Sequence, residues 1–121
     1  MRDHTKLMAF ELADQMALEV YRVTKRFPKE ELFGLTSQLR RAAVSAASNI
    51  VEGCARGGEA DYIRFLDTAY ASACEAQYQV SLAHRLHYLT DSDYRSLHET
   101  CDHASKVLGA LIKALRQRPC R

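Results

Sequence analysis

Hydrophobic residues recur along most of this chain at intervals of three or four positions, the spacing that places them on one side of an α-helix. Four segments with this spacing are predicted to be helices, and they cover residues 6–26, 29–54, 59–87 and 92–116. The segments between them are Phe27-Pro28, the glycine-rich stretch 53–58, and Leu89-Thr90-Asp91. Proline disfavours helical backbone in the residue before it, glycine accepts the geometry that ends a helix, and threonine or aspartate caps the helix that follows.

The main hydrophobic stripe of each helix predicts how the helices pack. In the second helix this stripe comprises Leu32, Leu35, Leu39, Ala42, Ala43, Ala46, Ile50 and Gly53. In the fourth helix it comprises Tyr94, Leu97, Cys101, Ala104, Leu108, Leu111 and Leu115, a seam of the coiled-coil type. Helices joined by short connections pack antiparallel, and 121 residues suit one core. We therefore expect an all-α fold in which residues 1–121 form a single antiparallel up-down four-helix bundle.

Two helices carry a second, weaker stripe that an isolated bundle does not need. In the second helix it consists of Arg40, Val44, Ala47 and Val51, and in the third of Ala71, Tyr78, Leu82 and Leu89. A helix of an isolated four-helix bundle buries one face, so additional apolar stripes indicate a partner surface. We expect self-association into a symmetric homo-oligomer. The alternative is a wide core stripe with scattered apolar residues on the surface.

Small polar residues lie along one flank of the second helix and face a matching position on the third. Because such residues are poor helix formers, they are better explained by hydrogen bonds to a neighbouring helix. The predicted structural polar network comprises Gln38, Ser45, Asn49, Glu52, Ser72 and Glu75. Arg41 with Glu75 is one candidate ion pair within it. A ligand site is the alternative interpretation of this flank.

Composition and charge exclude several classes of protein. Hydrophobic residues make up 47% and charged residues 26% of the chain, which is typical of a globular protein. No apolar run approaches the roughly 20 residues that span a bilayer, and the first residues lack the apolar segment of a signal peptide. We expect a cytoplasmic protein without a membrane partner. The net charge of +2 is too small to indicate nucleic-acid binding by itself.

The sequence contains no set of residues with the spacing of a known catalytic or metal-binding motif. The cysteines Cys54, Cys74, Cys101 and Cys120 match no metal or redox spacing, and they are expected to be reduced. Of these, Cys74 and Cys101 are expected to pack as small hydrophobic residues, and Cys120 lies in a basic C-terminal tail. His84 and His87 are three residues apart, but no inward carboxylate is spaced to complete a metal site. We predict no catalytic residue, no cofactor, no metal and no enzymatic activity.

Nearly the whole chain resembles the 23S rRNA intervening-sequence family of four-helix-bundle proteins, most specifically in the segment from Phe27 to Arg56. The matching residues are Tyr21, Thr24, Phe27-Pro28, Glu31, Gly34-Leu35, Gln38, Arg40-Arg41-Ala42, Ser45, Asn49-Ile50, Glu52-Gly53 and Arg56. The third helix continues the match with Phe65-Leu66, Ala69, Ser72 and Glu75. Ala47 departs from the family's proline before Ser-Asn-Ile, so a straighter second helix is expected here.

The resemblance implies an up-down bundle that assembles as a ring, typically a pentamer, with no established enzymatic activity. It also implies rRNA or the ribosome as a partner, because the family's reading frames lie inside insertions in 23S rRNA genes. A more distant similarity to the accessory subunit of diversity-generating retroelements implies a helical partner of a nucleic-acid enzyme.

The leading hypothesis is therefore a non-enzymatic oligomeric module that binds rRNA or a ribonucleoprotein through repeated arginines. The candidate nucleic-acid-binding residues are Arg40, Arg41, Arg56, Arg64, Lys113, Arg116 and Arg118. A protein-interaction adaptor without direct RNA contact is the second hypothesis. A small-molecule or metal pocket near His84 and His87 is the third.

Overall fold

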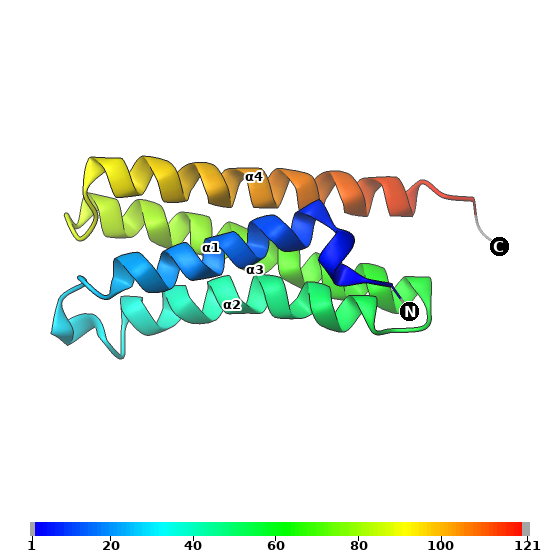
Figure 1. The fold of residues 1–121 in the computed structure, drawn as a ribbon, viewed down its shortest axis with the longest axis horizontal. Helices are drawn as coiled ribbons and strands as arrows, with labels where there is room; N and C mark the ends of the chain where they lie inside the picture. Colours follow the sequence, from blue (N-terminus) through cyan, green and yellow to red (C-terminus); the bar gives the residue numbers. More distant parts are fainter. Residues whose placement is uncertain (1, 120–121) are drawn as a thin grey trace.

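The computed structural model describes residues 2–119, and within them the chain forms a bundle of four α-helices with no strand. The helices are α1 (Met8–Thr24), α2 (Leu35–Cys54), α3 (Glu59–Arg85) and α4 (Asp91–Arg116). Helices adjacent in sequence run in opposite directions, and α1 and α4 also pack together, which closes the bundle (Figure 1). The predicted all-α four-helix fold is confirmed. Cys120 and Arg121 of the predicted basic tail lie outside the described residues.

One apolar core runs along the bundle axis and takes side chains from every helix. Met16, Leu39, Leu66 and Leu108, one from each helix, are fully buried. Runs of buried alanine allow α2 and α3 to approach closely; they are Ala42, Ala43, Ala46, Ala69, Ala73 and Ala76. The helical spacing seen in the sequence therefore corresponds to the buried faces.

The second helix begins later than predicted. Lys29–Glu31 forms a 3-10 turn, η2, and α2 starts only at Leu35, after Gly34 with φ −113° and ψ −116°. A carboxylate oxygen of Glu31 accepts a hydrogen bond from the Leu35 amide at 3.1 Å, which satisfies one of the free N–H groups at the new helix start. Leu32, predicted to lie in the core stripe, is half exposed instead. From Leu35 to Cys54 the helix is unbroken.

The other helix ends also differ slightly from the predicted ones. At the start of the chain, His4–Lys6 forms a separate 3-10 turn, η1, before α1 begins at Met8, and α1 ends at Thr24. The third helix ends at Arg85 because His87 adopts a left-handed conformation with φ 64°. The Tyr88 amide then donates to the Ala83 carbonyl at 2.9 Å, which closes the helix end.

Two predictions concern the connection between α3 and α4: the place of Leu89 in the second stripe, which is wrong, and the cap of α4, which is confirmed. Leu89, assigned to the second stripe of the third helix, lies beyond the helix end and is buried in the core. The Thr90 hydroxyl accepts a hydrogen bond from the Asp93 amide at 3.0 Å, so threonine caps α4 as predicted. Within the described residues, no helix is both long enough and apolar enough to cross a membrane.

Candidate functional site

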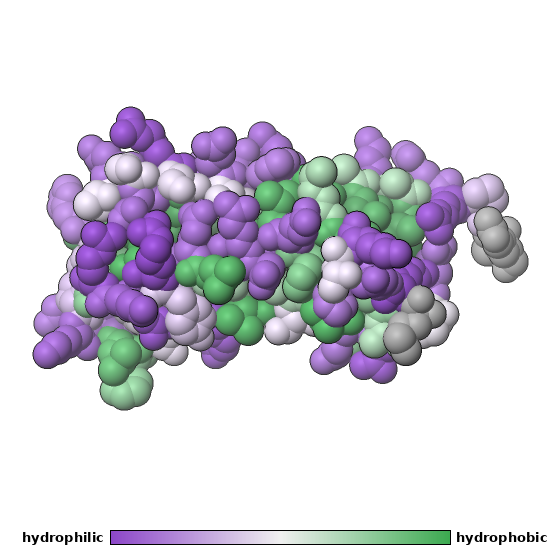
Figure 2. Space-filling view, viewed as in Figure 1, coloured by the Kyte–Doolittle hydropathy of each residue, from purple (hydrophilic) through white to green (hydrophobic). Residues whose placement is uncertain are grey.

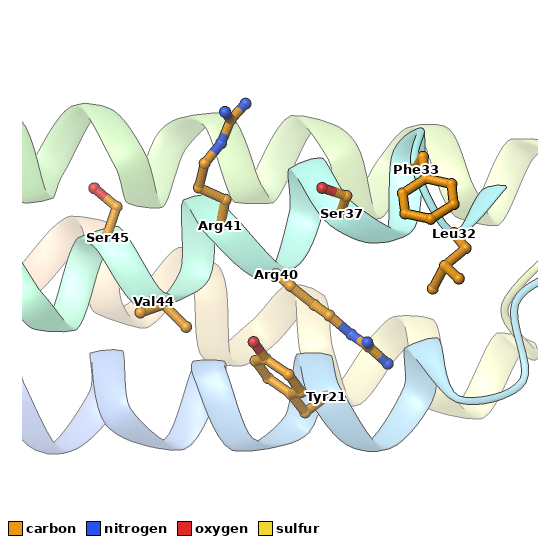
Figure 3. A pocket seen from close by; sticks show the side chains of 8 residues that line it. All are labelled: Tyr21, Leu32, Phe33, Ser37, Arg40, Arg41, Val44 and Ser45. Carbon is orange, nitrogen blue, oxygen red and sulfur yellow. The ribbon is translucent and has the colours of Figure 1, made fainter.

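A surface groove between α1, α2 and the connection that precedes α2 combines apolar and basic side chains. Its volume is about 570 Å³, and it is lined by Tyr21, Leu32, Phe33, Ser37, Arg40, Arg41, Val44 and Ser45 (Figure 3). In the space-filling view, hydrophobic side chains gather in the strip between α1 and α2 and at the projecting α1–α2 connection (Figure 2). The second stripe predicted on the second helix therefore lies partly along this groove, through Arg40 and the exposed Val44. Val51 of the same stripe is exposed too, but it does not line the groove.

The connection that presents Phe33 is held in place by Glu31. One carboxylate oxygen of Glu31 bonds the Leu35 amide, and the other accepts the Tyr88 hydroxyl at 2.8 Å. These two bonds lower the pKa of Glu31, the Leu35 amide contributing more, and the Tyr88 pKa is raised by the same contact. The Phe27 ring packs against Tyr88 with centres 5.5 Å apart and anchors the start of the connection. Phe33 itself remains 94% exposed.

Arg40 is fixed at the groove wall by two contacts with α1. Its Nε donates to the Thr24 hydroxyl at 2.8 Å, and Thr24 donates in turn to the Val20 carbonyl at 2.7 Å. The guanidinium carbon lies 4.7 Å from the centre of the Tyr21 ring, a cation–π contact. Arg40 therefore points toward α1, whereas the exposed Arg41 leaves the opposite side of α2 (Figure 3).

Neither groove arginine is neutralised by a neighbour. Among residues 2–119, no carboxylate forms an ion pair with Arg40 or Arg41. A smaller hollow of about 150 Å³ adjoins the groove, shares Leu32 and Arg40 with it, and is also lined by Lys25 and Lys29. These two lysines likewise lack an ion pair within the described part of the chain. The groove is consequently a site of uncompensated positive charge.

The other predicted arginines lie at the opposite end of the bundle and are paired with acids. The pairs are Arg56–Glu52 at 3.5 Å, Arg64–Asp61 at 3.2 Å, Arg118–Glu59 at 2.9 Å, and Arg116–Asp67. Lys113 lines a separate groove beside Tyr70 and Gly109 and forms no ion pair with a described residue. The structure thus divides the seven predicted residues between the two ends of the bundle. Arg40 and Arg41 share one groove, whereas Arg116 shares a groove with Lys113 and another with Arg118 but is itself paired with Asp67.

The structure brings half of the predicted polar network together. The Ser45 and Ser72 hydroxyls lie 2.8 Å apart, and the Asn49 amide donates to the Ser45 hydroxyl at 3.0 Å. The remaining members are placed elsewhere: Gln38 is exposed, Glu52 pairs with Arg56, and Glu75 accepts from Gln79 at 3.3 Å. The candidate Arg41–Glu75 ion pair is absent among the described residues.

The histidines near the end of α3 do not converge on a common site. The Nε2 atom of His84 lies 2.8 Å from Asp91, and its ring stacks on Tyr94 at 4.0 Å. His87 follows the helix end and is exposed. Across residues 2–119 no three His, Cys, Asp or Glu side chains are grouped so as to hold a metal ion.

The two buried cysteines, Cys54 and Cys101, have the environment of unreactive thiols. Burial, followed by the nearby carboxylates Glu19 and Asp102, raises the pKa of Cys101 to about 12. Burial also raises the pKa of Cys54. Both groups remain protonated near neutral pH, and a protonated thiol is a poor nucleophile. Cys74 is exposed, so its predicted role as a packed hydrophobic residue is wrong.

Sequence reasoning did not place four residues at the candidate site: Tyr21 and Phe33, which line the groove, and Lys25 and Lys29, which line the adjoining hollow. Because the helical spacing continues from Lys29 to Gly34, this segment was predicted to be part of the second helix. The one signal in the sequence was Gly34, because glycine adopts backbone conformations that interrupt a helix. With the helix start moved to Leu35, the preceding residues become a projecting connection.

Comparisons with known proteins identify the family to which the chain belongs. The family model described as 23S rRNA-intervening sequence protein matches residues 5–110. A similar solved structure is that of a protein of unknown function from the S23 ribosomal protein family of Bacteroides thetaiotaomicron VPI-5482, with a TM-score of 0.79. The two chains are 26% identical, and the match covers 87% of this chain and 95% of the other. No curated protein sequence matches the chain. Since the family model spans most of its length, the chain belongs to the 23S rRNA-intervening sequence protein family.

Proposed function

We propose that this protein is a non-enzymatic, oligomeric helical module that binds rRNA or a ribonucleoprotein through Arg40 and Arg41. The observation that carries the proposal is the groove in which both guanidinium groups lack a described carboxylate partner. Guanidinium groups suit phosphate because they are planar and donate in pairs. Arg40 donates a hydrogen bond only through Nε, to Thr24, so its terminal nitrogens have no hydrogen-bond partner among the described residues.

Assembly as a homo-oligomeric ring, with five copies as the family resemblance implies, would repeat the groove around the particle. Support comes from the outer face of α3, where Tyr78 is 60% exposed and lies on the same side as the half-buried Leu82. Exposed apolar residues on one helix face are typical of subunit contacts. Repetition of a modest positive site raises the avidity for a polyanion without a large net charge on each chain.

Salt-dependent RNA binding tests the proposal. Fragments of 23S rRNA are titrated with wild type, Arg41→Gln, Arg40→Gln and the matched control Arg64→Gln, whose arginine is paired with Asp61. Each groove substitution should weaken binding and lower the salt slope by about 1 for each phosphate that the variant no longer neutralises. The Arg64→Gln control should change the RNA affinity and the salt slope much less. Wild type that binds no RNA at low salt, or equal weakening in all three variants, would remove Arg40 and Arg41 from the role.

The exposed Leu32 and Phe33 favour a second candidate, an adaptor that docks a protein partner without touching RNA. Two neighbouring apolar side chains on a projecting connection are typical of a protein-contact surface. Apolar contacts are insensitive to salt concentrations that abolish phosphate contacts. A complex with a protein partner that persists at high salt, with no RNA binding at low salt, would favour the adaptor.

A further inference from the structure

We infer that the groove takes unpaired bases, with Phe33 as the stacking platform, so that the RNA ligand is single-stranded rather than duplex. The inference rests on the proposed function and names the class of RNA. It follows from the placement of the Tyr21 and Phe33 rings in one groove with two arginines that form no ion pair with a described residue.

Phe33 has the properties of a preformed stacking surface. Its side chain is 94% exposed, although phenylalanine is normally buried. The connection that carries it is fixed at both ends, by the 3-10 turn Lys29–Glu31 and by the Glu31–Leu35 hydrogen bond. A ring presented on an ordered connection loses little conformational freedom when a base stacks on it. Every base has a π-face that can stack on this ring. Because phenylalanine has no hydrogen-bond donor or acceptor, the ring does not select one base over another.

Positive charge follows this platform along α2, with one arginine on each side of the helix (Figure 3). Arg40 lies over the Tyr21 ring on the α1 side of the groove, and Arg41 leaves the other side of α2 (Figure 3). Ser37, between them and Phe33 in sequence, exposes a hydroxyl that suits a ribose 2′-OH. Aromatic rings for bases with flanking cations for phosphates are the recurring design of single-strand binding sites.

A duplex does not fit this combination. In a duplex the bases stack on one another and expose no face, so Phe33 would contact sugar and phosphate or remain in water. The arginines alone would then bind, as they would any polyanion. The groove volume of about 570 Å³ lies within the range of about 300–1,000 Å³ typical of sites for small organic groups.

The chain contains no tryptophan, so Phe33→Trp introduces a single fluorescent reporter at the platform. This variant is titrated with oligouridylate, with the same strand carrying abasic positions, and with the duplex formed by adding its complement. We expect fluorescence quenching by the single strand alone. In parallel, Phe33→Leu should weaken single-strand binding by about 5- to 150-fold without changing the salt slope. Phe33→Tyr, which keeps the ring, should bind as wild type does.

The outcomes separate this inference from the proposed function. Salt-dependent binding of equal strength to all three RNAs would overturn the inference and leave the proposed function intact. Absence of binding to any of them at low salt would overturn both. Equal binding by the Phe33→Leu and wild-type proteins would also overturn the inference. Quenching that depends on protein concentration without RNA would assign Phe33 to a protein contact instead.

Discussion

The hydroxyl groups of Ser45 and Ser72 lie 2.8 Å apart and join α2 to α3 midway along the bundle. The Asn49 amide donates to the Ser45 hydroxyl at 3.0 Å and to the Ser45 carbonyl at 2.8 Å, which orients the pair from within α2. Ser72 is buried, and its neighbours on the same face are alanines. A polar contact between otherwise apolar faces aligns the two helices at one register.

The Ser45–Ser72 contact should appear as a coupling energy. In a double-mutant cycle of Ser45→Ala and Ser72→Ala, we expect a coupling of about 0.5–1.5 kcal/mol in the free energy of unfolding, measured by urea denaturation. Ser48→Ala is the matched control, because Ser48 is exposed and has no hydrogen bond from its side chain to a described residue. Strictly additive effects of the two substitutions would show that the hydroxyls contribute independently.

The bundle was predictable because most of its buried positions follow a period of 3.6. Leu39, Leu66 and Leu108 lie at such positions, and each is fully buried. The segment before α2 was not predictable from that period. Its apolar residue Leu32 fits the helical spacing. However, the Leu35 amide donates its hydrogen bond to the Glu31 carboxylate rather than to the carbonyl of a preceding helical turn. A local side-chain contact therefore prevails over a pattern that continues through it.

The candidate site shows a second limit of sequence reasoning. Ion pairing between residues three or four apart, as in Arg56–Glu52, can be predicted for a helix. Pairing of Arg118 with Glu59 joins residues far apart in sequence and depends on how the helices are arranged. The sequence identified the arginines, but only the fold distinguishes the paired ones from Arg40 and Arg41.

Two glycines should respond in opposite ways to the same substitution. A Cβ at Gly53 would lie 2.9 Å from the Phe65 Cβ, which cannot rotate away, so α2 and α3 must separate. Gly53→Ala should therefore destabilise the bundle by about 1–3 kcal/mol despite the better helix propensity of alanine.

Gly109→Ala is the matched comparison in α4. Its Cβ would lie 3.4 Å from the Tyr70 ring, an ordinary contact, and alanine favours a helix interior. We expect a gain of about 0.5–1 kcal/mol in the free energy of unfolding, measured by urea denaturation. A stabilising Gly53→Ala would contradict the close helix contact.

Protonation of Glu31 should weaken the α2 start. Its hydrogen bonds to the Leu35 amide and the Tyr88 hydroxyl place its folded-state pKa below the ordinary value of 4.5. A lowered pKa means that the ionised group adds stability above pH 4.5, and this contribution disappears as the pH falls through the folded-state pKa. Glu31→Gln should have a lower melting temperature than wild type at pH 7. Between about pH 7 and pH 3 its melting temperature should fall by less than that of wild type.

Circular dichroism melts at several pH values give the comparison. Glu30→Gln is the control, because its carboxylate makes no hydrogen bond to a described residue. The Glu31→Gln and wild-type curves should converge below the folded-state pKa. Parallel curves over the whole range would show that the Glu31 charge does not contribute to stability.

The proposed ring should depend on the outer face of α3. Tyr78 is 60% exposed there, and a positive charge at its position would be buried against the neighbouring subunit. We expect wild type to have a mass in solution five times that of the 13.7 kDa chain, measured by light scattering. Tyr78→Lys should shift the mass toward that of one chain, because removal of a central aromatic side chain from an interface costs about 2 kcal/mol or more.

Leu18→Lys is the matched control for this substitution. Leu18 is similarly exposed, at 68%, but it lies on the outer face of α1 rather than α3. Its variant should keep the wild-type mass, and both variants should keep the wild-type helix content because neither side chain is part of the core. A monomeric wild type would reject the ring. An oligomeric wild type whose mass falls with Leu18→Lys and not with Tyr78→Lys would move the subunit interface to α1.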